Sequence, residues 1–145
     1  MKQIKYLILS LIILVLSTFN MTQAKSYSAA EVQCIQTMLH HEARAEPIQG
    51  RVAVIQVVLN RMKDSRFPDT ACGVIHQKGQ FSWVGKGNTI QEKSLYESNK
   101  AVVRDVLAGK YKDPTGGAIF FNSNHRSPTK TAKLTVRIGG HSFYK

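Results

Sequence analysis

The spacing of apolar and polar positions predicts three long helices. Apolar residues recur at helical intervals over Ser28–Arg44, Pro47–Lys63 and Ile90–Ala108. Pro47 breaks the first segment and suits the first turn of the second, whereas Gly109 stops the third. The second segment is apolar on nearly every side, which is typical of a buried helix.

The rest of the chain predicts turns, then a small antiparallel sheet. Residues 64–70 form a predicted turn, residues 74 and 75 a short helical piece, and residues 80–83 a short strand or extended segment before a Gly-rich loop at residues 85–88. Three candidate strands follow, at Ala118–Asn122, Leu134–Ile138 and His141–Tyr144, with Gly139-Gly140 as a hairpin turn. Helices first and a small sheet last predict an α+β domain.

The N-terminal segment is typical of a secretory signal peptide. Two lysines precede an apolar run at residues 6–19, and Thr22-Gln23-Ala24 resembles a cleavage site. The run is shorter than the roughly 20 residues of a membrane-spanning helix. We therefore expect a signal peptide at residues 1–24 and one catalytic domain at residues 25–145. An uncleaved anchor, or transient membrane association through residues 1–24, stays an alternative.

Charge beyond the signal segment predicts an anionic partner. Residues 25–145 hold eighteen Lys and Arg against nine Asp and Glu, a net charge of +9. A basic exported protein suits cell wall polymer or lipid head groups. The cations are scattered, without the interleaved aromatic residues of a nucleic-acid-binding surface. We expect a monomer in the periplasm, at the cell wall or outside the cell, and no nucleic acid partner.

The two cysteines, Cys34 and Cys72, leave two possibilities open. In an oxidising compartment they can form one disulfide, which typically stabilises a fold by about 2–4 kcal/mol. They can equally be two buried thiols, because the sequence does not reveal the distance between them.

Ionisable residues concentrate between the first two helices, at residues 40–51. At 100° per residue, Glu42 falls on the same helix face as Ile35, Met38 and Leu39. A carboxylate at the end of an apolar stripe, beside a helix C-terminus, is either paired or held protonated, and the second state is what a general acid needs. The alternative is a structural salt bridge from Glu42 to Arg44, Arg51 or Arg61.

The His41-Glu42 pair raises the question of a zinc site. A zinc metalloprotease motif needs a second His four residues after the first, and position 45 is Ala. The five histidines are otherwise dispersed, without metal-ligand spacing. We therefore expect no metal and no cofactor.

A series of short motifs runs along the chain in order: Glu42-Ala43-Arg44, Glu46-Pro47, Leu59-Asn60-Arg61, Phe67-Pro68, Gln80-Phe81-Ser82, Phe120-Phe121 and Ile138-Gly139 with His141. The series resembles the signature of the spore-cortex-lytic (SleB-type) cell wall hydrolases. The resemblance implies a mainly helical lysozyme-like or lytic-transglycosylase-like fold and cleavage of peptidoglycan. It also implies that Glu42 is the essential acid.

The chain departs from this pattern in places. His41 and Ala45 stand where the family usually has glycines, and Arg51 follows Gly50 where the family has Gln. These differences leave the reaction class in place but weaken spore cortex as the substrate. A vegetative wall suits the chain better, attacked by the cell itself or by a phage endolysin.

The expected reaction cleaves the glycan between N-acetylmuramic acid and N-acetylglucosamine. A glycosidase that uses water needs a second carboxylate, whereas a lytic transglycosylase can use Glu42 alone as acid and base. Glu46 is the only acidic neighbour, a possible auxiliary group that we expect to order the turn or pair with Arg51. Two alternatives remain, a zinc-dependent N-acetylmuramoyl-L-alanine amidase and a non-catalytic basic wall-binding module.

Five residues are candidates for substrate binding. Gln80 and Ser82 can bond sugar hydroxyl or N-acetyl groups, and Trp83 can offer a flat face to a sugar ring. His141 matches a family position, and Tyr96 is a weaker candidate. Core positions are expected instead for most of Phe120, Phe121 and Tyr144.

Overall fold

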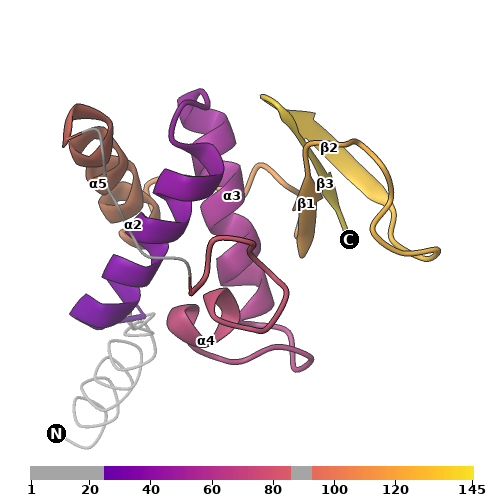
Figure 1. Ribbon diagram of the computed structural model, residues 1–145, viewed down its shortest axis with the longest axis horizontal. Coiled ribbons are helices and arrows are strands. Elements are labelled where there is room, and N and C mark those ends of the chain that lie inside the picture. The colour runs from indigo at the N-terminus through magenta and orange to yellow at the C-terminus, as the bar shows by residue number, and fades with distance from the viewer. Residues whose placement is uncertain (1–24, 86–92) are drawn as a thin grey trace, which may run out of the picture.

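In the part of the chain that the structure describes, four helices precede a small sheet, in the predicted order. The computed structural model describes residues 25–85 and 93–145. The helices are α2 (Ala29–Ala43), α3 (Ile48–Arg61), α4 (Ala71–Ile75) and α5 (Lys93–Leu107), and the strands are β1 (Phe120–Asn122), β2 (Leu134–Ile138) and β3 (His141–Tyr144). In Figure 1 the helices occupy one side of the molecule and the sheet the other.

Helix α2 begins at a capping box. The Ser28 hydroxyl accepts the Glu31 N–H, and the Glu31 carboxylate accepts the Ser28 N–H. Glu31 also accepts the Ala71 N–H at the start of α4. These backbone bonds, that from Ser28 first, hold the pKa of Glu31 below its usual value. One carboxylate thus caps α2 and joins it to α4.

Helix α3 is the centre of the core. Ten of its fourteen residues are buried, among them Arg61 in the last turn. The helix packs against α2, α4 and α5 on one side and against β1 and β2 on the other. Because α3 contacts nearly every other element, its last turn is firmly placed next to the sheet.

The sheet has three antiparallel strands in the order β1-β3-β2. Strand β3 lies in the middle and is buried along its whole length. Phe121 pairs with Phe143 and Asn122 with Ser142, while β2 joins β3 through the predicted turn at Gly139-Gly140. This register sets residues of β1 beside the start of β3.

A polar network ties the approach to β1 to the end of α3. The Asn60 amide donates to Asp113 (2.9 Å) and to the Ala118 carbonyl (3.0 Å). Asp113 also accepts bonds from the Thr115 N–H and hydroxyl. Burial alone raises the pKa of Asp113, but the bonds from Thr115 and Asn60 outweigh it and lower the pKa. The network holds β1 against α3.

Residues 80–83, predicted to be a short strand or extended segment, form a pair of turns. The Gln80 N–H bonds the Gln77 carbonyl, and the Val84 N–H bonds the Phe81 carbonyl. The alternation of polar and apolar residues arises because Phe81 is buried while Gln80 and Ser82 are exposed. Residues 1–24, most of the predicted loop at 85–88 and the predicted start of the third helix lie outside the described residues.

A disulfide joins Cys34 of α2 to Cys72 of α4, with the two Cα atoms 5.4 Å apart. Of the two possibilities that the sequence left open, the structure has the crosslink. It closes a loop of 38 residues that contains all of α3.

Removing this crosslink should destabilise the domain. In the chain-entropy model, a loop of this length corresponds to about 3–4 kcal/mol. We expect the C34A/C72A double variant to lose about that much free energy of unfolding in urea, relative to the oxidised parent. The reduced parent is the matched control, and it should unfold at nearly the same urea concentration as the double variant. A loss below about 1 kcal/mol would contradict the prediction.

Candidate active site

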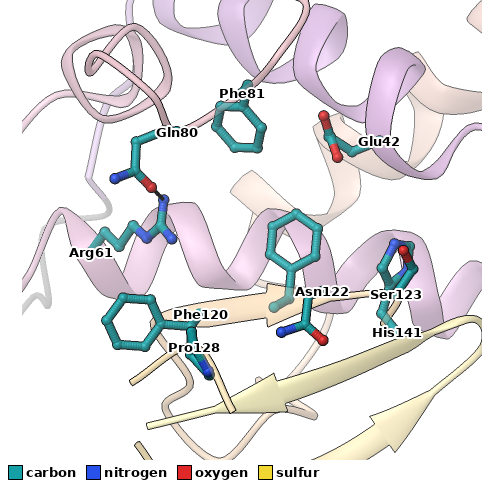
Figure 2. A pocket seen from close by; sticks show the side chains of 10 residues that line it. Glu42, Arg61, Gln80, Phe81, Phe120, Asn122, Ser123, Pro128 and His141 are labelled. Carbon is teal, nitrogen blue, oxygen red and sulfur yellow. Dashed lines mark hydrogen bonds between the residues drawn. The ribbon is translucent and has the colours of Figure 1, made fainter. Parts of the chain in front are cut away.

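A cleft of about 330 Å³ lies where the ends of α2 and α3 face the turn at residues 80–81 and strand β1. It is lined by Glu42, Arg61, Gln80, Phe81, Phe120, Phe121, Asn122, Ser123, Pro128 and His141. Figure 2 shows Glu42 at one end and the pair Gln80–Arg61 at the other. The lining therefore combines one carboxylate, one guanidinium, neutral polar groups and aromatic rings.

Glu42 lies in the last turn of α2 and is half-buried. The Trp83 indole N–H donates to its Oε1 atom over 2.7 Å. Among the described residues, Glu42 forms no salt bridge with Arg44, Arg51 or Arg61. The structural ion pair that was the alternative is therefore not found, and the carboxylate faces the cleft.

Two aromatic rings, those of His41 and Phe81, contact Trp83. The His41 ring stacks on it, with centroids 4.5 Å apart and planes 15° from parallel. Phe81 lies 5.8 Å away at a tilted angle. His41 thus covers one face of the indole. The sequence predicted that Trp83 presents a flat face to a sugar ring. A role of Trp83 in binding substrate stays a prediction, and its bond to Glu42 is what the structure shows.

Arg61 is a buried cation in the cleft, with 5% of its surface exposed. Its Nε donates to the Ile119 carbonyl (2.7 Å) and its Nη1 to Gln80 Oε1 (2.9 Å). Burial lowers the pKa of Arg61 to about 10, so the guanidinium stays charged at neutral pH. The sequence presented Arg61 only as a possible partner for Glu42. Its place in the Leu59-Asn60-Arg61 motif was the sequence signal that could have identified Arg61 as a cleft residue.

The bond from Arg61 orients the Gln80 amide. Because its oxygen accepts the guanidinium N–H, its NH₂ group remains available to donate to an acceptor in the cleft. Figure 2 shows this bond as a dashed line. Gln80 therefore lies where the sequence predicted a polar contact, and it presents donors rather than an acceptor.

His141 begins strand β3 and lines the cleft with only 8% of its surface exposed. Its ring meets the edge of Phe121, with centroids 5.3 Å apart. Its Nδ1 lies 3.8 Å from Glu46 Oε1. Asn122 and Ser123, which the sequence reasoning missed, lie beside it on the same wall. His141 is thus both a cleft residue and a neighbour of the second carboxylate.

Glu46 does not line the cleft. Its Oε2 accepts the Gly140 N–H (3.0 Å) in the turn between β2 and β3. Arg51, the other expected partner, instead donates to Ser98 and Asn99 of α5. The sequence predicted that Glu46 orders its own turn or pairs with Arg51, whereas its bond reaches the turn between β2 and β3.

The remaining predicted residues lie away from the cleft. Ser82 is exposed, and the Tyr96 hydroxyl bonds Gln36 while its ring contacts His40. In contrast, Phe120 and Phe121 both line the cleft although core positions were expected. Phe121 lies 6.4 Å from Phe81, whereas the Phe120 ring lies 5.9 Å from the Arg61 guanidinium.

Among residues 25–85 and 93–145, no three His, Cys, Asp or Glu side chains lie together as a metal site requires.

Comparison with known proteins fits this geometry. The cell wall hydrolase family model matches residues 45–144. The chain belongs to this family. The chain is similar to the spore cortex-lytic enzyme of Bacillus cereus, with 34% identity over 122 residues, which are 82% of this chain and 46% of the relative. It is also similar to the spore cortex-lytic enzyme of Halalkalibacterium halodurans, with 37% identity over 120 residues, which are 81% of this chain and 35% of the relative. The chain therefore spans less than half the length of these relatives.

Two solved structures share the fold of this cell wall hydrolase. The catalytic domain of the germination-specific lytic transglycosylase SleB from Bacillus anthracis has a TM-score of 0.69 and 32% identity, over 83% of this chain and 98% of that one. The catalytic domain of Bacillus cereus SleB has a TM-score of 0.70 and 33% identity, over 83% and 94%. The predicted α+β, lysozyme-like fold is thereby confirmed.

The contact between Glu46 and the turn of β2 and β3 can be tested at Gly139. A Cβ atom there would overlap Glu46 Oε2, whereas one at Gly79 would meet nothing within 4 Å; both glycines have positive φ. We expect G79A to cost about 1 kcal/mol of unfolding free energy for the φ angle alone, and G139A about 2–4 kcal/mol.

A double variant separates the two costs. In the E46A background the overlap is gone, so the additional cost of G139A should fall to that of G79A. Urea unfolding of the four proteins measures this. Equal costs of G139A with and without Glu46 would show that the carboxylate does not hold the turn.

Proposed function

We propose that this cell wall hydrolase is a lytic transglycosylase, which cleaves peptidoglycan glycan strands between N-acetylmuramic acid and N-acetylglucosamine. The observation that carries the proposal is the lining of the cleft. Among the described residues, Glu42 is the only carboxylate that lines it. The SleB structure from Bacillus anthracis, similar in fold, is named a lytic transglycosylase, which supports the same reaction here.

One carboxylate can perform both proton transfers of this reaction. Glu42, protonated, donates its proton to the glycosidic oxygen as the bond to C1 of the muramic residue breaks. The 6-hydroxyl of the same residue then attacks C1, and the Glu42 carboxylate accepts the hydroxyl proton. The product is a 1,6-anhydro-muramic end, and Glu42 returns to its protonated state.

Hydrolysis would need a second carboxylate. Glycosidases that use water place two carboxyl groups about 5–9.5 Å apart across the scissile bond. The nearest candidate in the sequence, Glu46, is bound to the Gly140 N–H and does not line the cleft. Its engagement favours the single-carboxylate reaction over hydrolysis.

The other cleft residues suit a sugar substrate. Phe81, Phe120 and Phe121 provide apolar surface for the faces of sugar rings, and Gln80 provides amide donors for N-acetyl carbonyl oxygens. His141 lines the cleft and, in this proposal, bonds a hydroxyl group of the sugar. The net positive charge of residues 25–145 favours attraction to an anionic cell wall.

The Glu42→Gln variant tests this proposal. We expect the parent domain to release muropeptides with anhydro-muramic ends from purified sacculi, and E42Q to lose at least about 10²-fold in rate, because the amide cannot donate the proton. Mass spectrometry of the released fragments identifies the ends. The matched control is E97Q, a change to an exposed carboxylate on α5 that pairs with Lys100, and it should keep the parent rate.

Each alternative has its own outcome in that experiment. Reducing muramic ends would indicate hydrolysis. Free stem peptides would indicate an amidase, and unchanged wall binding without any release would indicate a binding module. Full activity of E42Q would remove Glu42 from the mechanism.

We also propose export through residues 1–24, and a monomer that acts in the periplasm or at the cell wall, on the cell's own wall or as an endolysin. The disulfide supports an oxidising compartment. No helix within the described part of the chain is long and apolar enough to cross a membrane.

Export should leave a defined N-terminus. In a bacterial host that secretes the full chain, intact-mass measurement of the extracytoplasmic protein should show an N-terminus at Lys25. A protein that retains residues 1–24 and sediments with membranes would instead support the anchor.

A further inference from the structure

His41 is a side chain that the transglycosylase mechanism does not use. It precedes Glu42 on α2 and stacks on Trp83 at 4.5 Å. Its Nε2 atom is buried and has no hydrogen-bond partner among the described residues. Burying an unpaired ring nitrogen is unfavourable, so a compensating role for the ring is expected. The ring stacks on Trp83 and meets the His40 ring edge-on at 5.6 Å.

The stacked pair contacts Glu42 from outside the cleft. Neither His41 nor Trp83 lines the cleft, yet the Trp83 N–H donates to Glu42 Oε1 over 2.7 Å. Indole nitrogen is a donor only, so Oε1 must remain an acceptor whether Glu42 is ionised or protonated. A carbonyl oxygen accepts a hydrogen bond more readily than a carboxylic hydroxyl oxygen does, so this bond favours the proton of protonated Glu42 on Oε2. No hydrogen bond among the described residues occupies Oε2.

We propose that His41 is a positioning residue, which stacks on Trp83 so that the indole N–H holds Glu42 Oε1 and leaves Oε2 as the oxygen that exchanges the proton with the substrate. Without the stack, the indole can turn about its own side-chain bonds, and the carboxylate loses a fixed orientation. Misplacement of a catalytic group by about 1 Å can cost up to 10²-fold in rate. The proposal rests on Glu42 being the acid.

Trp83 is the only tryptophan of the chain, which makes the contact directly measurable. In a ¹⁵N-labelled protein the indole N–H gives a single cross-peak, and its position reports the hydrogen bond to Glu42. We expect this cross-peak to shift in E42Q and in H41A, and to lie near its parent position in H41F, which keeps an aromatic face. These spectra need no substrate, so they test the geometry even if the proposed reaction is wrong.

Kinetics on sacculi test the consequence. We expect H41A to lower kcat about tenfold with an apparent KM within twofold of the parent, and H41F to restore most of the lost kcat. The matched control is H76A, a change to an exposed histidine that follows α4, and it should match the parent in both measurements. A raised KM with an unchanged kcat would overturn the proposal, because the pair would then act in substrate binding.

If circular dichroism shows that H41A does not fold, the W83F variant tests the proposal instead. This variant keeps a ring under His41 but has no N–H to donate. A loss in kcat similar to that expected for H41A supports the proposal, and an unchanged kcat overturns it. An indole cross-peak that does not move in H41A or E42Q overturns it as well.

Discussion

A half-buried carboxylate makes one of the bonds that join the helices to the sheet. Glu46, in the turn between α2 and α3, accepts the Gly140 N–H in the turn between β2 and β3, 94 residues later. The contact is so close that a side chain at Gly139 or Gly140 would collide with it. Since Glu42 precedes Glu46 by one helical turn and His141 follows Gly140 directly, this bond sets the two walls of the cleft opposite each other.

Within the cleft, charge is sparse and unevenly placed. One carboxylate and one buried guanidinium line it, and they are not paired with each other in the part of the chain described. Arg61 donates from Nε to a backbone carbonyl and from Nη1 to the Gln80 amide. Glu42 accepts the Trp83 N–H at Oε1 and forms no salt bridge among the described residues. This arrangement suits a reaction in which the same group donates and then recovers a proton.

Much of this could be predicted from the sequence because the signals were local. The position of Glu42 followed from the apolar stripe of α2, and the turn at Gly139-Gly140 from its glycines. What could not be predicted depends on contacts between distant segments. The bond from Trp83 to Glu42 spans 41 residues, and that from Arg61 to Ile119 spans 58. Residues 80–83 resembled a strand or extended segment because Phe81 alternates with polar neighbours, although their backbone bonds form turns.

The central claim is that one carboxylate both donates and recovers the proton, with no water consumed. Cleavage of sacculi in water enriched in ¹⁸O tests it most directly. We predict that mass spectrometry finds no ¹⁸O in the new muramic end, since the attacking oxygen is the sugar's own 6-hydroxyl. Incorporation of one ¹⁸O atom at that end would show that water attacks, and would contradict the account.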